Sequence, residues 1–419
     1  MRSRSISPRY WILLVVYSVL WTLALPFLFF VKRLKPVNGQ RFALGLPSGP
    51  FQVWIQAASV GEAKLAASLA HKLNNMGLTN VLVTTNTASG MEVLEKELDE
   101  NTQKAYFPFD SLYIMPWALR KIRPGSLVLL ETELWPGLLY LCRRKNIPVI
   151  LGNGRLSLKS FCRYFPLRNL LAAVGPGEIA AVTGREAERF SSLFPDANIR
   201  VMPNIKFDLL AETKLIAYVQ NPLSSYFKPK HPLIVLGSIR KEEERAIFKV
   251  IQKIVHNRPK TTIALFPRHL TRIEHWQSIL SKSNIPYTLR SGLETGSAPS
   301  GVIIWDGFGE LESAYALARS AFVGGSLMPC GGQNFLETLA QGTIPCVGPF
   351  WDNFSWVGRE IIDAGLLIQV RDENELYSQL IQPQSLSREQ VEKKFQEYLT
   401  RYQGGTSYLA NLIRQKTHR

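Results

Sequence analysis

The sequence has few cysteines and lacks the short motifs of several common enzyme classes. Its 419 residues include four cysteines, and no two of them form a C-x-x-C pair. This argues against a disulfide framework or a structural metal site. The absence of G-x-x-x-x-G-K-[ST], H-E-x-x-H and G-x-S-x-G argues against P-loop NTPases, zinc hydrolases and α/β-hydrolases. No D-x-D motif is present, so we expect no metal, and basic side chains would have to stabilise any phosphate leaving group.

Negative charge is scarce relative to positive charge. There are 33 Asp and Glu residues against 49 Lys and Arg residues, a net charge of +16. This balance favours an anionic partner: a nucleic acid, an acidic lipid surface or a phosphorylated substrate. Hydrophobic residues make up 46% of the chain, so a sizeable core can be buried, and the length predicts two domains.

The first long apolar run predicts an N-terminal membrane anchor helix. Residues 10–31 carry no charge and, as a helix, would span about 30 Å, the thickness of a hydrocarbon core. Basic residues lie on both sides, so the positive-inside rule leaves the orientation open. A cleaved signal peptide is the alternative, but the run is too long and no small-residue cleavage site follows. Pro26 permits a kinked or shallow insertion.

Beyond the anchor, short apolar runs alternate with helical periodicity. FQVWIQAAS, NVLVTTNT and SLVLLETE are examples in the first half, and PLIVLGS, TTIALFPRH and GVIIWDGFG in the second. Such alternation predicts an α/β fold with two Rossmann-like, doubly wound parallel-sheet domains facing a cleft. We divide the chain into an anchor (1–35), a first domain (36–206), a link (207–232) and a second domain with a C-terminal helix (233–419).

Charged residues follow the predicted strands of the first domain. Glu62 comes after FQVWIQAAS, Glu131 and Glu133 come after SLVLL, and Lys206 lies beside Asp208 where the domain ends. Ligands bind at the carboxyl ends of parallel strands, so these side chains are candidates for chemistry. Each has an alternative role. Glu62 would favour its helix dipole, the other glutamates would be solvated, and the Lys–Asp pair would be a surface pair.

The second domain contains four motifs typical of a phosphate or nucleotide site. A cation, Arg268, ends one strand, and glycine-rich turns occur at 307–311, 324–326 and 331–337. Glycines that open a helix expose backbone N–H groups to an anion. Each turn alone could end an ordinary strand, but one crevice would collect all four.

A basic segment after the fourth strand of the first domain predicts a lipid contact. Arg155, Lys159 and Arg163 recur every four residues, which would place them on one helical face. Aromatic and apolar residues surround them. We expect this face to meet anionic inner-membrane lipids or acceptor phosphates; the alternative is a solvated face above the core.

The order of these motifs resembles the 3-deoxy-D-manno-octulosonic acid (Kdo) transferases of lipopolysaccharide synthesis. The resemblance runs from the predicted anchor to about Arg359. Its motifs, in order, are A-x-x-x-G-E, E-T-E-L-W-P, N-x-R-L-S, K-F-D, P-R-H, G-E-L, V-G-G-S-L and G-G-x-N-x-L-E. The resemblance implies an inverting GT-B glycosyltransferase that moves Kdo from CMP-Kdo to the lipid A precursor. It implies an enzyme at the inner membrane with cytoplasmic catalytic domains, without a cofactor and without a nucleic-acid partner.

The resemblance also assigns roles to individual residues. It implies that the first domain binds the acceptor, with Glu62 as general base and with Glu131 and Lys206 stabilising the transition state. The CMP contacts in the second domain would be Pro267, Arg268, Phe308, Gly309, Glu310, Asn334, Phe335, Leu336 and Glu337.

Two stretches depart from the family pattern. The usual S-T-H-E-G-E-E is S-I-R-K-E-E-E at residues 238–244, and the usual G-G-H-N is G-G-Q-N at 331–334. A transferase for a UDP-sugar and a membrane-anchored basic binding protein stay as alternatives. A nucleic-acid binder would show a stripe of basic and aromatic residues, and we find none beyond residues 155–168.

Overall fold

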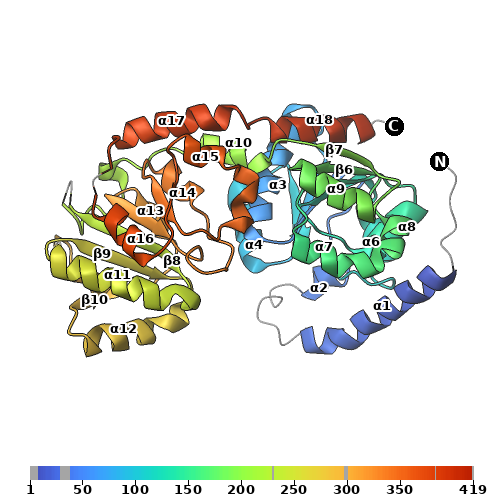
Figure 1. Ribbon diagram of the computed structural model, residues 1–419. Helices are drawn as coiled ribbons and strands as arrows, with labels where there is room; N and C mark the ends of the chain where they lie inside the picture. The colour runs from blue at the N-terminus through green and yellow to red at the C-terminus, as the bar shows by residue number, and fades with distance from the viewer. Residues whose placement is uncertain (1–7, 29–37, 229–230, 297–300, 383, 418–419) are drawn as a thin grey trace. The chain divides into compact units, whose positions relative to one another are not determined.

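The chain folds into two compact α/β units. The computed structural model describes residues 8–28, 38–228, 231–296, 301–382 and 384–417. One unit comprises Met1–Leu209 and Tyr402–Arg419, and the other comprises Leu210–Arg401. Each is built around a parallel sheet, as Figure 1 shows. The prediction of two parallel-sheet α/β domains is confirmed.

A parallel sheet forms the centre of the first unit. Its described strands lie in the order β3-β2-β1-β4-β5-β6-β7. Their bounds are β1 (Phe51–Ala57), β2 (Val81–Thr85), β3 (Gln103–Tyr106), β4 (Pro124–Leu130), β5 (Val149–Gly154), β6 (Glu178–Ala181) and β7 (Asn198–Val201). Successive side chains of a strand point to opposite faces. Trp54 therefore joins the core on one face, while Val53 and Ile55 join the core on the other.

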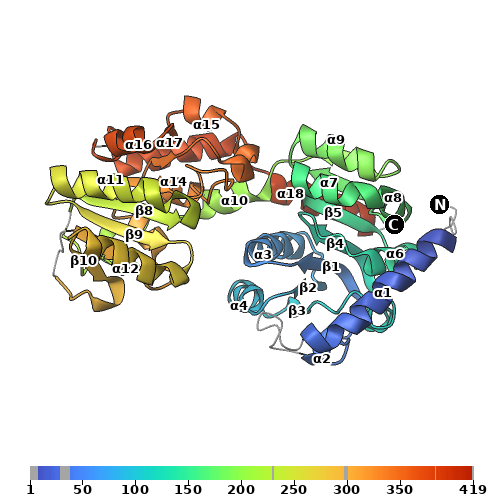
Figure 2. The same ribbon diagram turned by 60° about the horizontal axis from the view of Figure 1, so that its bottom comes forward.

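Helices cover both faces of this sheet, as Figure 2 shows. Residues of α3, α4 and α18 pack on one face, and residues of α5, α6, α8 and α9 pack on the other. The bounds are α2 (Asn38–Arg41), α3 (Val60–Asn75), α4 (Ala88–Glu97), α5 (Met115–Ile122), α6 (Pro136–Arg144), α7 (Leu158–Tyr164), α8 (Arg168–Val174), α9 (Gly184–Leu193), α10 (Ile205–Glu212) and α18 (Gly405–Thr417). Ser59, Thr87 and Thr183 cap α3, α4 and α9, which sets where these helices begin.

The second unit has a sheet of the same kind. Its described strands lie in the order β10-β11-β9-β8-β12-β13-β14. They are β8 (Leu233–Ile239), β9 (Thr262–Pro267), β10 (Tyr287–Leu289), β11 (Gly301–Ile304), β12 (Ser320–Val323), β13 (Pro345–Val347) and β14 (Ile368–Gln369). One face packs against α11, α12 and α16. The helices are α11 (Glu244–Asn257), α12 (Ile273–Lys282), α13 (Leu311–Tyr315), α14 (Leu336–Ala340), α15 (Glu360–Asp363), α16 (Glu373–Leu380) and α17 (Arg388–Thr400).

The C-terminal helix α18 belongs to the first unit, not to the second as predicted. Leu409 and Ile413 are buried in the core that α3 shares, and Figure 1 shows α18 beside α3. The Asp208 carboxylate accepts hydrogen bonds from the backbone N–H groups of Gly404 (2.7 Å) and Thr406 (2.6 Å). The chain therefore returns to the first unit because this core and this carboxylate hold its last helix.

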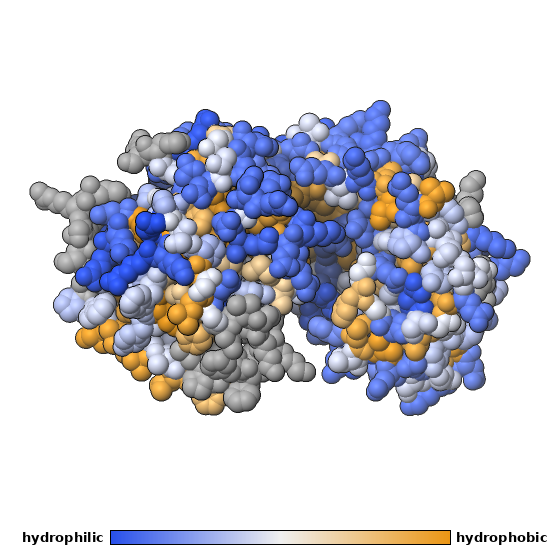
Figure 3. Space-filling view, turned by 180° about the vertical axis from the view of Figure 1, so that it is seen from behind, coloured by the Kyte–Doolittle hydropathy of each residue, from blue (hydrophilic) through white to orange (hydrophobic). Residues whose placement is uncertain are grey.

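The N-terminal helix α1 (Pro8–Leu28) packs along the first unit. Leu14 is buried, and the Tyr17 hydroxyl donates a hydrogen bond to Asp110 Oδ2 (3.0 Å). The rest of its surface exposes apolar side chains, part of the orange band at the lower left of Figure 3. They are Trp11, Ile12, Leu13, Val16, Val19, Leu20, Leu23 and Phe27.

The predicted membrane-spanning anchor is not supported. Within the parts of the chain that the structure describes, no helix combines the length and the apolar character needed to cross a bilayer. The predicted run, 10–31, extends past α1 into residues 29–37, which lie outside the described residues, as do residues 1–7. One side of α1 is used for packing within the protein, which a pattern of hydrophobicity alone does not show.

Candidate active site

Glu62 lies where β1 ends and α3 begins. Its carboxylate accepts hydrogen bonds from the Ala58 N–H (2.8 Å) and the Ser59 hydroxyl (2.9 Å), and the side chain is 8% exposed. Glu62 lies in the first turn of α3, where a negative charge favours the helix dipole as the alternative role predicted, and its hydrogen bonds also help to cap the helix. A carboxylate has about four lone-pair positions, so these two contacts leave room for a further proton donor.

Glu131 and Lys206 form an ion pair beside it. The distance from Lys206 Nζ to Glu131 Oε1 is 2.6 Å, and both side chains are largely buried. Strand β4, which ends just before Glu131, is the direct neighbour of β1. Glu131 has a φ of 56°, a left-handed conformation that is uncommon outside glycine and that clusters at functional sites.

Two asparagines position Lys206 at the start of α10. Asn153 Oδ1 accepts a hydrogen bond from the Ile205 N–H (3.0 Å), and Asn204 Oδ1 accepts one from the Lys206 N–H (3.0 Å). Asn153 also has a positive φ, 51°, and belongs to β5, the neighbour of β4. The ends of β4 and β5 and the start of α10 are thus tied together by buried polar contacts.

The charges of this cluster act on Glu62. Burial raises its pKa above the usual value, and the Ala58 N–H acts against this. The negative charge of Glu131 raises the Glu62 pKa further, whereas the positive charge of Lys206 lowers it. Glu62 is therefore a carboxylate whose basicity is increased, as a general base requires.

Glu133 is the residue that sequence reasoning noticed without assigning a role. Its Oε2 accepts a hydrogen bond from Trp135 Nε1 (3.0 Å). Burial, followed by the negative charge of Glu62, raises the pKa of Glu133 to about 8. The E-T-E pattern is the signal for this residue, but the pattern cannot tell which glutamate pairs with a cation.

Arg155 belongs to the cluster around Glu131 and not to a basic helical face. Its Nη1 lies 3.7 Å from Glu131 Oε1, and its carbonyl accepts a hydrogen bond from the Thr132 hydroxyl. Helix α7 begins only after Ser157, whose hydroxyl caps it. The predicted stripe of Arg155, Lys159 and Arg163 on one helix is therefore wrong, although Lys159 and Arg163 are both exposed on α7.

The predicted nucleotide contacts follow strands of the second sheet. Pro267 is buried at the end of β9, and Arg268, which follows it, is exposed. The Arg268 N–H donates to the carbonyl of Ile239 (2.8 Å), the last residue of the neighbouring strand β8. This bond fixes the backbone from which the guanidinium extends.

The next predicted contacts, Phe308 to Glu310, follow β11. Phe308 is 78% exposed, and Gly309 has a φ of 90°. Glu310 accepts two hydrogen bonds from Arg290 (2.9 and 3.0 Å) and one from Trp305 (2.9 Å). The Glu310 carboxylate thus orders this turn.

The last predicted contacts, Asn334 to Glu337, surround the start of α14. Asn334 Nδ2 donates to Glu337 Oε1 (2.7 Å), and both side chains are partly exposed. Phe335 and Leu336 are buried, and Phe335 packs against Trp351. A ligand could therefore contact only the backbone of Phe335 and Leu336, whereas the side chains of Asn334 and Glu337 are accessible. The motif alone does not show this difference.

The two departures from the family pattern lie side by side. A Cβ placed on Gly325, which follows β12, would lie 3.2 Å from Arg240 Cδ and 3.3 Å from Gln333 Cγ. Glu243 holds this turn, since it accepts hydrogen bonds from the N–H groups of Gly325 (2.6 Å) and Arg240 (3.0 Å). The two histidines of the family pattern are replaced in this chain by Arg240 and Gln333, which both lie next to Gly325.

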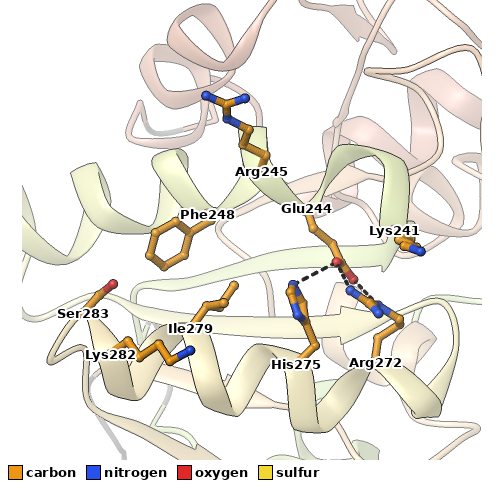
Figure 4. Close-up of a pocket in the computed structure, with 9 residues that line it drawn as sticks. All are labelled: Lys241, Glu244, Arg245, Phe248, Arg272, His275, Ile279, Lys282 and Ser283. Carbon is orange, nitrogen blue, oxygen red and sulfur yellow. Dashed lines mark hydrogen bonds and ion pairs between the residues drawn. The ribbon is translucent and has the colours of Figure 1, made fainter.

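A surface groove lies between α11 and α12 of the second unit (Figure 4). Its carboxylate, Glu244, accepts two hydrogen bonds from Arg272 (2.9 and 2.5 Å) and lies 3.3 Å from His275. None of the predicted site residues lines it. The lining residues are Lys241, Glu244, Arg245, Phe248, Arg272, His275, Ile279, Lys282 and Ser283. Among the described residues, no group of His, Cys, Asp and Glu could hold a metal ion.

Two doubly wound parallel-sheet units are the architecture of the GT-B fold. A solved structure supports this fold. The crystal structure of a glycosyltransferase from Rickettsia africae ESF-5 has a TM-score of 0.58 at 10% sequence identity and covers 88% of this chain and 99% of that chain.

Sequence comparisons define the family within this class. Residues 32–209 match the family described as 3-deoxy-D-manno-octulosonic-acid transferase (kdotransferase). The chain is 31% identical over 340 residues to the 3-deoxy-D-manno-octulosonic acid transferase of Bordetella pertussis, covering 76% of each chain. It is 27% identical over 372 residues to that of Haemophilus influenzae, covering 87% of each. The chain belongs to the Kdo transferase family and is a glycosyltransferase.

Proposed function

We propose that the protein transfers Kdo from CMP-Kdo to a hydroxyl of a lipid A precursor, with inversion at the anomeric carbon. The observation that carries this proposal is the cluster of Glu62, Glu131, Lys206 and Arg155 in a chain of the Kdo transferase family. A base of raised pKa beside a fixed ammonium group suits attack by a hydroxyl on a donor with a phosphate leaving group.

The proposed reaction is a single displacement. The acceptor hydroxyl gives its proton to Glu62 while its oxygen forms a bond to the anomeric carbon of Kdo. The bond from that carbon to the CMP phosphate oxygen breaks, and CMP leaves with the electron pair. Lys206 stabilises the charge that develops on the phosphate, and Glu131 holds the ammonium group in place. Because attack and departure occur on opposite sides, the configuration inverts.

The experiment that tests this function is a transfer assay with the full chain. CMP-Kdo and a tetraacylated lipid A precursor should give a Kdo-bearing product, equally well with and without EDTA. A UDP-sugar in place of CMP-Kdo should give none. Transfer from a UDP-sugar, or no transfer from CMP-Kdo by a protein that remains folded, would contradict the proposal.

We expect Arg268→Ala to weaken CMP binding by about 1.5–3 kcal/mol, the range for a hydrogen bond to a charged group. The reason is that Arg268 extends an exposed guanidinium from a backbone fixed between β8 and β9. Calorimetry with CMP measures the change. Arg258→Ala is the matched control, since Arg258 is exposed just after α11, at the other end of β9. If Arg268→Ala and Arg258→Ala bind CMP with equal affinity, Arg268 does not contact the nucleotide.

We also propose that the protein associates with the membrane surface through α1, without crossing the bilayer. The apolar side chains that α1 exposes form a continuous surface, with Leu23 at 64% and Phe27 at 73% exposure. A helix with an apolar face can lie in the plane of the interface. In this arrangement the first unit, which holds Glu62, lies next to its lipid substrate.

The exposed surface of α7 is expected to contribute to this contact. Replacing Lys159 and Arg163 by Glu should raise the KM for the lipid acceptor and reduce binding to anionic vesicles. Each cation near an anionic surface contributes about 1 kcal/mol, and the effect should be largest at low salt. Leu158 and Phe165 add exposed apolar area beside these cations.

The control is the same charge reversal at Lys393 and Lys394, which are exposed on α17 of the second unit. Vesicle co-sedimentation and acceptor titration measure both effects. If the two double variants behave alike, α7 is ordinary surface.

A further inference from the structure

The first unit gathers more carboxylates than cations around Glu62. Glu131 engages both nearby cations, Lys206 at 2.6 Å and Arg155 at 3.7 Å. Glu62 is held as an acceptor by a backbone N–H and a hydroxyl. Glu133 is different, because its one hydrogen bond among the described residues comes from the neutral Trp135 indole. An anion at Glu133 is therefore the least compensated of the three.

The groups around Glu133 favour its neutral form. Glu62 of α3 and Glu131 of its own loop both raise the pKa of Glu133, in addition to burial. From α7 comes Tyr164, whose own pKa is raised by burial and by Glu133, so its phenol is neutral. At neutral pH Glu133 is thus protonated while Glu62 is the base. Neighbouring carboxyls whose environments separate their pKa values commonly divide the acid and base roles.

The position of the proton follows from the hydrogen bonds. Trp135 Nε1 donates to Oε2 of Glu133 (3.0 Å), so Oε2 is the acceptor and the proton resides on Oε1. Trp135 is itself fixed, since its ring packs against Phe107 with centroids 5.0 Å apart. A rigid neighbour therefore holds the carboxyl group, and Oε1–H is left to donate to a ligand.

We propose that Glu133 is a neutral carboxylic acid whose Oε1–H donates a hydrogen bond to an acceptor-sugar oxygen near the hydroxyl that Glu62 deprotonates. The inference rests on the proposed function and extends it. Its role is to bind and orient the acceptor, so its loss affects kcat/KM for the acceptor. Deprotonation removes the donor and places a negative charge beside the acceptor.

The test compares the pH dependence of kcat/KM for the acceptor in the full chain and in Glu133→Gln. In the unchanged protein, kcat/KM should fall about tenfold per pH unit above pH 8, as it does when an essential acid loses its proton. Glu133→Gln should keep most of the activity at pH 7, because a neutral amide also donates, and should lack this alkaline fall. Glu133→Ala should be impaired at every pH, through a higher KM.

Two results would overturn the inference. One is an alkaline fall that persists unchanged in Glu133→Gln. The other is a Glu133→Gln variant that is folded but as impaired at pH 7 as Glu133→Ala, which would show that the anion is needed. Failure of the proposed function has a different signature, since no transfer from CMP-Kdo would then occur in the unchanged protein. Thermal melting of both variants separates loss of folding from loss of the donor.

Discussion

Replacing Glu62 by Gln is expected to lower the transfer rate by about 10²–10⁴-fold, the contribution of a general base. The amide cannot take the proton of the attacking hydroxyl, whereas the carboxylate is available beside Glu131 and Lys206. CMP binding should not change, because the predicted CMP contacts all belong to the second unit. Single-turnover transfer and calorimetry with CMP measure the two effects.

The control for this variant must account for the capping role of Glu62. Thr183 and Glu186 at the start of α9 repeat the Ser/Thr-x-x-Glu pattern, and the Thr183 hydroxyl donates to Glu186 Oε2 (2.9 Å). Glu186→Gln should therefore have a similar, small effect on stability, because Gln is also found at this position of capping boxes, with little effect on transfer. If Glu62→Gln only matches this control, Glu62 is a cap and not the base.

Replacing Lys206 by Met is expected to reduce transfer by about 10²–10³-fold, the usual cost of losing a group that stabilises transition-state charge. The variant should also change the pH dependence. Lys206 lowers the pKa of Glu62, so its removal raises that pKa. The acidic limb of the kcat/KM profile should then move to higher pH.

Glu131→Gln provides the opposite test. The negative charge of Glu131 raises the pKa of Glu62, so its removal should move the acidic limb to lower pH. Lys96→Met, a change of an exposed lysine on α4, is the control for the loss of one positive charge in Lys206→Met. If Lys206→Met and Glu131→Gln move the acidic limb of the kcat/KM profile in the same direction, Glu62 is not the titrating base.

The sequence predicted the sheets well because parallel strands buried on both faces are nearly continuous apolar runs. β1 and β4 are examples, and the residues that follow them come together because neighbouring parallel strands end at one edge. Glu131 and Lys206 could be brought together by this rule although they are 75 positions apart in the sequence.

The parts that the sequence missed depend on long-range contacts or on exact helix starts. Nothing local in α18 shows that Leu409 and Ile413 complete the core of the first unit. Arg155 fits a four-residue spacing, but Ser157 caps α7, which begins at Leu158, three residues after Arg155. The partner of each glutamate in E-T-E is set by side chains from other strands and helices, as the contact from Lys206 to Glu131 shows.

The hydrogen bond between Tyr17 and Asp110 connects α1 to the start of α6. The buried Asp110 carboxylate also accepts hydrogen bonds from the N–H groups of Gly137 (2.9 Å) and Leu138 (2.6 Å). These residues open α6, directly after the segment that carries Glu131 and Glu133. Burial already raises the Asp110 pKa to about 6, and the Tyr17 hydroxyl opposes that rise.

Detaching α1 would therefore remove the Tyr17 hydrogen bond and open the buried Asp110 carboxylate to solvent, which would weaken its hold on the start of α6. A shortened enzyme without its first 28 residues is expected to lose transfer activity as well as the proposed membrane association, since the segment that carries Glu131 and Glu133 would lose its support. Extraction into a detergent that strips α1 from the protein should have the same consequence. The proposed membrane association and the support of the segment that carries Glu131 and Glu133 therefore depend on the same helix, α1.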